Sequence, residues 1–145
     1  MLKTLPLFIL LLVFAGCKTY STEALPETQL YFGSGGGFAG TFTEYMLLEN
    51  GQFFKRESQA GTFEALPKVK RSQAKLLFAD WTKQEMNEQD FQHPGNLYHF
   101  VRMENKGQKH RISWGSSSHP TPDGIKQFYA ACQALIPKTD TSKNN

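Results

Sequence analysis

The stretch Tyr31-Phe32-Gly33-Ser34-Gly35-Gly36-Gly37-Phe38-Ala39-Gly40 decides the fold, because it concentrates glycine between two strand-like segments. Five of the 12 glycines in the chain fall between Gly33 and Gly40, directly before Thr41-Phe42-Thr43. Glycine accepts positive φ and lets two backbones approach closely, so the pattern predicts a turn of special shape. We interpret it as a shaped loop and as a candidate contact loop. The alternative is a wide β-turn whose Phe38 fills the core.

The residues around this loop predict three antiparallel strands. The first runs from Gln29 to Phe32, the second from Thr41 to Leu48 and the third from Gln52 to Glu57. Asn50-Gly51 predicts a two-residue type I′ turn, because both residues tolerate positive φ. That turn sets four pairs: Leu48 with Phe53, Leu47 with Phe54, Tyr45 with Arg56 and Glu44 with Glu57.

A second hairpin is predicted at Asn105-Lys106-Gly107, between strands at residues 97–104 and 108–114. A three-residue turn with glycine in the left-handed position fits this pattern. Its register pairs Phe100 with Ile112 and Tyr98 with Trp114 on the core face. The same register places Val101 and Met103 on the opposite face.

Two helices follow from apolar residues at helical spacing. The first begins at Ser72 and ends near Met86, and the second begins at an N-cap Thr121 with Pro122 in the first turn. The residues that should face the core are Ala74, Leu77, Phe78 and Trp81 in the first helix, and Ile125, Phe128, Tyr129, Cys132 and Leu135 in the second. The predicted fold class is therefore α+β, an antiparallel sheet in βββ-α-ββ-α order with both helices on one face.

The N-terminus has the pattern of an export signal over residues 1–16: one lysine, an apolar run and small residues. Ala15-Gly16-Cys17 resembles the lipobox of bacterial lipoproteins, although Phe14 stands where leucine is more usual. The resemblance implies cleavage before Cys17 and lipidation of that cysteine. Because Lys18 rather than an acidic residue follows, it also implies an outer membrane, with the domain facing the periplasm. An ordinary secreted protein, or an uncleaved anchor with an incidental Cys17, is the alternative.

The remaining chain divides into three parts. Residues 17–28 are polar and predict a tether behind the lipidated Cys17. Residues 29–137 form a single α+β domain. Residues 138–145 contain no apolar side chain, and we expect them to be a disordered tail.

The charge balance argues against nucleic acid as a partner. Loss of the signal leaves 15 basic and 13 acidic residues, which is close to neutral. Lys68-Val69-Lys70-Arg71 is the one dense basic cluster in the sequence. A solvated surface is the preferred interpretation of this cluster, and a binding patch is the alternative.

Candidate catalytic and metal-binding groups do not assemble into a known pattern. The four histidines lack zinc-site spacing, and the predicted register places His99 and His110 on opposite faces. Gly35-x-Gly37-x-x-Gly40 matches a dinucleotide motif, but a strand rather than a helix should follow it. Ser116-Ser117-Ser118-His119 reads as a polar loop, and Cys132 as a buried small hydrophobe. We therefore expect no enzymatic activity, no metal and no cofactor.

The glycine–aromatic motif and the order of the elements resemble the emfourins, small protein inhibitors of thermolysin-like metalloproteases. The residues that carry the resemblance are Gly36-Gly37-Phe38-Ala39-Gly40, the helix around Ala74–Trp81, Tyr98-His99-Phe100 and the strand from His110 to Trp114. It implies that Gly36, Gly37, Phe38, Ala39 and Gly40 bind a metalloprotease. The chain departs from the family at Asn96, where an acidic residue is favoured, and in carrying a signal and lipobox.

The sequence thus predicts a lipid-anchored, non-enzymatic binding domain of the envelope, with emfourin-like protease inhibition as its most specific form. A structural or envelope-assembly lipoprotein with another partner is the alternative.

Overall fold

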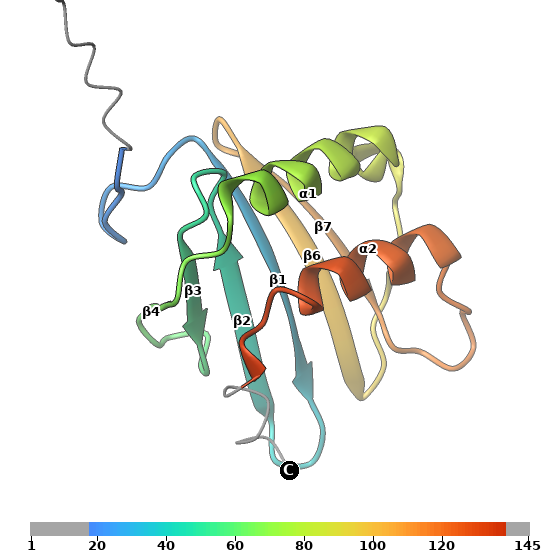
Figure 1. The fold of residues 1–145 in the computed structure, drawn as a ribbon. Coiled ribbons are helices and arrows are strands. Elements are labelled where there is room, and N and C mark those ends of the chain that lie inside the picture. Colours follow the sequence, from blue (N-terminus) through green and yellow to red (C-terminus); the bar gives the residue numbers. More distant parts are fainter. Residues whose placement is uncertain (1–17, 139–145) are drawn as a thin grey trace, which may run out of the picture.

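The computed structural model describes residues 18–138, which form one sheet with two helices packed on one of its faces (Figure 1). The sheet has strand order β4-β3-β2-β1-β6-β7-β5, and only β5 and β7 pair in parallel. The elements are β1 (Thr28–Gly36), β2 (Thr41–Leu47), β3 (Phe53–Arg56), β4 (Glu64–Leu66), α1 (Arg71–Lys83), the 3-10 helix η1 (Met86–Glu88), β5 (Gln92–His93), β6 (Leu97–Asn105), β7 (Gln108–Trp114) and α2 (Asp123–Gln133). The predicted fold class is confirmed; the short strands β4 and β5 were not predicted.

The first predicted hairpin register is wrong by one residue. Leu47 pairs with Phe53 and Glu44 with Arg56, and the Leu48 N–H donates to the carbonyl of Gln52. The reason lies in the turn: Gly51 has a φ of 88°, whereas Asn50 does not adopt positive φ. The loop is therefore one residue longer than a two-residue type I′ turn. In the resulting register Glu44 lies opposite the cation Arg56 rather than opposite Glu57.

The second predicted register is also wrong by one residue, in the opposite sense. Lys106 and Gly107 both adopt positive φ, so the turn has two residues and Asn105 pairs with Gln108. Because side chains alternate across a strand, the shift reverses the face of every β6 residue relative to β7. Val101 and Met103 face the helices, and Phe100 faces away from them.

The core between sheet and helices contains the predicted helical residues. Ala74, Leu77, Phe78 and Trp81 of α1 are buried, as are Ile125, Phe128 and Cys132 of α2. Rings of Trp81 and Phe128 meet edge to face at 5.6 Å, which joins the two helices. The N-cap of α2 is Pro122 rather than the predicted Thr121, and no side chain caps this helix. Burial raises the pKa of the Cys132 thiol, in agreement with a structural role.

The other face of the sheet carries a second apolar cluster, formed by Tyr31, Met46, Leu48 and Phe54. Tyr20 and Leu25 pack against this cluster, so the segment expected to be a tether lies on the sheet. The side-chain amide of Gln52 fixes Tyr20 by accepting from its N–H at 2.7 Å and donating to its carbonyl at 2.9 Å. Burial, reinforced by the negative charge of Glu104, raises the pKa of Tyr31 to about 12.

The rest of this face depends on glycines in the central strand β1. Gly33 lies between Glu44 on β2 and Phe100 on β6, and Gly35 lies opposite Tyr98. A Cβ on Gly33 would lie 2.0 Å from the Thr43 carbonyl oxygen, and one on Gly35 would lie 2.6 Å from the Tyr98 hydroxyl. The missing side chains therefore allow the β2 backbone to lie close to Gly33 and the Tyr98 ring to lie over Gly35.

A network of ion pairs lies on the same face of the sheet. The Glu44 carboxylate is 1% exposed and accepts from Arg56 Nε at 2.7 Å on one side. Arg102 Nη2 on β6 reaches it from the other side at 3.2 Å, with its guanidinium over the ring of Tyr31. One buried carboxylate therefore links β2, β3 and β6 on the face without helices.

We expect Gly33→Ala to lower the free energy of unfolding by about 2–4 kcal/mol, because backbone atoms cannot move away from the new methyl group. Gly124→Ala is the matched control: its nearest neighbour is a flexible Gln84 side chain at 3.4 Å, in a helix. That change should raise stability by about 0.5 kcal/mol. Urea unfolding measures the free energy of unfolding of both variants. Equal effects of the two substitutions would contradict the explanation that position 33 has no room for a side chain.

Glu44→Gln should cost about 3 kcal/mol of stability, because it removes the carboxylate between two largely buried guanidinium groups and leaves Arg102 with Glu104 alone as its acidic partner among the described residues. The control is Lys126→Gln, which removes an exposed ion pair with Asp123 at 3.4 Å and should change stability by less than about 0.5 kcal/mol. Denaturant midpoints of the two variants test this, and a neutral Glu44→Gln would show that the network of ion pairs is dispensable.

Candidate functional site

The predicted contact loop, Gly36 to Gly40, is the turn between β1 and β2 and projects from one end of the sheet (Figure 1). Gly36, Gly37 and Gly40 have φ values of 94°, 78° and 58°. The turn is closed by a hydrogen bond of 3.0 Å from the Gly40 N–H to the Gly37 carbonyl. Three left-handed positions in five residues explain why glycine gathers here.

Phe38 lies at the most exposed point of this loop, with a relative exposure of 110%. The alternative in which Phe38 fills the core is therefore wrong. The space under this end of the sheet is filled from α2 by Tyr129, whose hydroxyl donates to the Gly33 carbonyl at 3.2 Å. Its ring also meets those of Phe32 and Trp114 edge to face.

A neighbouring loop supports the contact loop from the side. The Gly37 N–H donates to the Asn96 carbonyl at 2.8 Å, and a Cβ on Gly36 would lie 2.0 Å from the same oxygen. Leu97 is 64% exposed, and its Cδ2 lies 3.0 Å from the Cβ position of Gly37. Leu97 was missed in the sequence because its apolar side chain fits a strand as well as a surface. The structure thus adds a second exposed apolar residue beside the loop.

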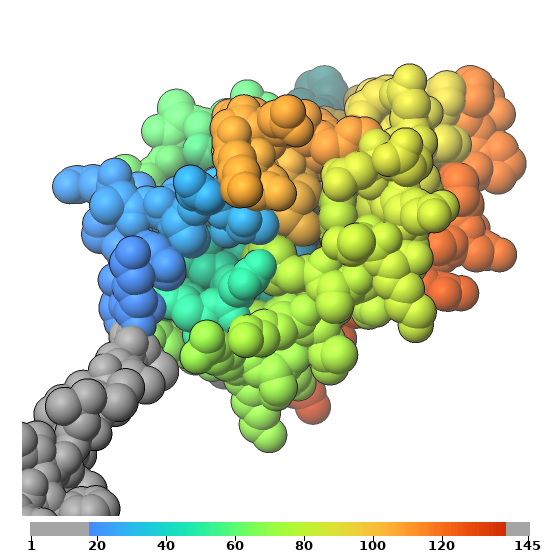
Figure 2. Space-filling view, turned by 90° about the horizontal axis from the view of Figure 1, so that it is seen from above, coloured from blue at the N-terminus to red at the C-terminus, as the bar shows by residue number. Residues whose placement is uncertain are grey.

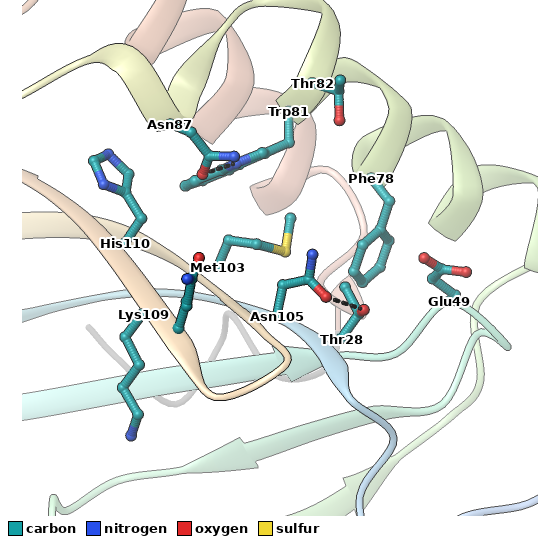
Figure 3. A pocket seen from close by; sticks show the side chains of 11 residues that line it. Thr28, Glu49, Phe78, Trp81, Thr82, Asn87, Met103, Asn105, Lys109 and His110 are labelled. Carbon is teal, nitrogen blue, oxygen red and sulfur yellow. Dashed lines mark hydrogen bonds between the residues drawn. The ribbon is translucent and has the colours of Figure 1, made fainter.

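A separate pocket of about 710 Å³ lies between α1 and the β6–β7 hairpin (Figure 3). Its polar groups are used largely to hold its walls together. The indole N–H of Trp81 donates to Asn87 at 2.9 Å, the Thr28 hydroxyl donates to Asn105 at 3.1 Å, and His110 Nε2 lies 3.1 Å from the Gln89 carbonyl. Glu49 and His110 lie at opposite sides of the pocket in Figure 3, so they do not form an acid–base pair.

The histidines occupy different places from those predicted. His99 and His110 lie on the same face of the sheet rather than on opposite faces, because the hairpin register differs by one residue. On β6, four positions separate His99 from Met103, the cross-strand partner of His110, so the two imidazoles are far apart. His93 and His119 do stack, with ring centroids 3.8 Å apart. Within residues 18–138 no group of three metal-ligating side chains comes together.

His99 itself is held in a small aromatic setting. Its Nδ1 lies 3.3 Å from the Tyr129 hydroxyl, and its ring contacts those of Trp114 and Tyr129. Burial lowers the pKa of His99 below its ordinary value, which favours the neutral imidazole. This arrangement suits a packed core histidine.

The glycine motif Gly35-x-Gly37-x-x-Gly40 leads into strand β2, as predicted. Dinucleotide sites of this kind need a helix at that place, whose N-terminus receives the pyrophosphate. The required context is therefore missing. Ser116 takes part in a turn, where its hydroxyl accepts from the Ser118 N–H at 3.3 Å.

The predicted signal, the lipidation residue Cys17 and the tail after Lys138 lie outside the described residues. Among residues 18–138, no helix combines the length and the apolar character needed to cross a membrane.

The sequence matches no model of a known protein family, and a comparison with curated proteins found no match.

Proposed function

We propose that this chain is a lipid-anchored domain of the bacterial cell envelope that binds a protein partner through the contact loop. In its most specific form the partner is a thermolysin-like metalloprotease, which the chain inhibits as an emfourin does. Binding by shape, rather than catalysis, is the activity proposed.

The observation that carries the proposal is the full exposure of Phe38 on a constrained hairpin. An aromatic side chain on a projecting turn can enter a concave cleft, and aromatic residues contribute strongly to binding energy. The glycines beside Phe38 leave the backbone open, so a partner's main chain can approach closely. Leu97 would extend the same apolar surface.

The direction of β1 supports a role at a distance from the membrane. β1 begins at Thr28, close to the first described residues, and ends at Gly36 in the contact loop. Nine strand residues span about 30 Å. If Cys17 carries the lipid, the loop is held on the side of the domain that faces away from the bilayer.

Inhibition assays with the full chain, purified in mild detergent, test this function against a set of thermolysin-like proteases. We expect stoichiometric inhibition, and Phe38→Ala should raise the inhibition constant at least tenfold, or about 1.4 kcal/mol. Leu76→Ala is the control, because Leu76 is 63% exposed on α1, away from the loop. It should leave inhibition unchanged.

Both variants remove an exposed side chain, so their thermal unfolding should match that of the parent chain. Absence of inhibition across the set, or an inhibition constant insensitive to Phe38, would reject the protease version. Mass spectrometry after affinity capture would then distinguish an envelope-assembly role, in which a membrane complex is recovered.

A further inference from the structure

The basic cluster Lys68-Val69-Lys70-Arg71 lies beside Lys18, the first described residue of the chain. The turn between β2 and β3 connects them: Asn50 Nδ2 donates to the Lys18 carbonyl at 2.8 Å, and the Val69 N–H donates to the Gly51 carbonyl at 3.0 Å. Lys18, Lys68 and Arg71 also line one shared groove. Residues 50 positions apart in sequence therefore form one surface.

The turn between β6 and β7 reaches the same end of the molecule, where the Lys106 N–H donates to the Glu27 carbonyl at 3.0 Å. Figure 2 looks onto this end and shows the N-terminal segment, the β2–β3 turn, the start of α1 and the β6–β7 turn around a hollow. We call it the Lys18 surface. Its exposed charged residues are the cations Lys18, Lys68, Lys70, Arg71 and Lys106 and the acids Glu23, Glu27 and Glu49.

This surface carries two more positive than negative charges, and its cations are not neutralised within the fold. In the described part of the chain none of the five forms an ion pair; Lys18 instead lies 5.1 Å from the centre of the Tyr20 ring. Lys70 is the N-cap of α1 and Arg71 its first residue, and the first turn contains no acid. Cations at a helix N-terminus oppose the helix dipole, so helix stability does not explain them.

The point at which the N-terminal segment joins the domain, at Lys18, determines what can contact this surface. Seventeen residues precede Lys18, and the carbonyl of Lys18 is already bonded to the domain. One residue spans about 3.5 Å, so a lipid on Cys17 would sit directly at this surface rather than at the end of a long tether. Headgroups around the anchor would then meet the basic residues.

We propose that the Lys18 surface lies on the anionic surface of a phospholipid bilayer, with Lys68, Lys70 and Arg71 beside lipid phosphate groups. The proposal rests on the lipid anchoring in the proposed function and deepens it. Juxtamembrane basic residues are attracted to anionic headgroups, and this attraction is screened by salt. The contact fixes the orientation of the domain, so that β1 stands away from the bilayer and carries the contact loop outward.

Lysine labelling of the full chain in lipid vesicles tests the proposal. The chain is reconstituted in vesicles of phosphatidylcholine alone, or of phosphatidylcholine with one third phosphatidylglycerol, and treated with a water-soluble amine reagent. Peptide mass spectrometry gives the labelling rate of each lysine. In anionic vesicles we expect Lys68, Lys70 and Lys106 to react about fivefold more slowly than in neutral ones, and high salt should abolish the difference. Lys126 on α2 should react equally in both.

A charge-reversal pair provides the second measurement. Lys68→Glu with Lys70→Glu should remove the protection of the unchanged Lys106, whereas Lys83→Glu with Lys126→Glu should retain it. Thermal unfolding checks that both double variants are folded. Equal labelling of the Lys18 surface in anionic and neutral vesicles would overturn the proposal, as would failure of the full chain to stay with the vesicles. Protection of the same lysines by dissolved inorganic phosphate in detergent would assign the surface to free phosphate instead of a bilayer.

Protease inhibition is measured in detergent without vesicles, so the two proposals can fail separately. If inhibition is absent but Lys106 is still protected in anionic vesicles, the protease partner is rejected and the membrane contact is supported. If the chain inhibits the protease but Lys106 is not protected in anionic vesicles, the membrane contact is rejected and the protease partner is supported.

Discussion

The absence of side chains at Gly33 and Gly35 is the constraint on which the face without helices depends. These two positions of β1 lie at the centre of the sheet, where a larger residue would meet the Thr43 carbonyl or the Tyr98 ring. Arg102 reaches from β6, over the ring of Tyr31, to the buried Glu44 carboxylate, which Arg56 also holds. Charge, aromatic rings and the N-terminal segment together close this face without a third layer of secondary structure.

The strand β1 runs between two ends of the molecule that differ in structure. At its start, hydrogen bonds from the Asn50 side chain and the Lys106 N–H hold the β2–β3 turn and the β6–β7 turn against the N-terminal segment. At its finish, left-handed glycines form a projecting turn that Asn96 supports from the side. Because β1 pairs with β6 along its whole length and with β2 from Leu30 to Gly36, the two ends are connected rigidly. A domain built in this way can be held at one end and bind at the other.

The sequence predicted the helices and the fold class well, because apolar spacing over three turns has one structural solution. Ala74, Leu77, Phe78 and Trp81 can share only one face of a helix, and tight turns between strands require antiparallel pairing. Hairpin registers were harder, since each depended on the φ of one residue. Asn50 kept negative φ and Lys106 adopted positive φ, the reverse of the usual preference. A shift of one residue then moved Phe100 to the other face and brought His99 and His110 onto the same one.

The loop residues were predicted as a group, but their exposure was not, because no periodic pattern governs a turn. The positive φ angles of the turn account for its glycines, whereas the fully exposed Phe38 contributes no packing to the fold. An exposed phenylalanine forgoes roughly 2 kcal/mol that burial would contribute, and a polar residue at this place would close the turn equally well. The surrounding hydrogen bonds hold the turn in shape before any partner arrives, which reduces the entropy lost on binding. The balance of these effects favours a side chain that is kept for contact with another molecule.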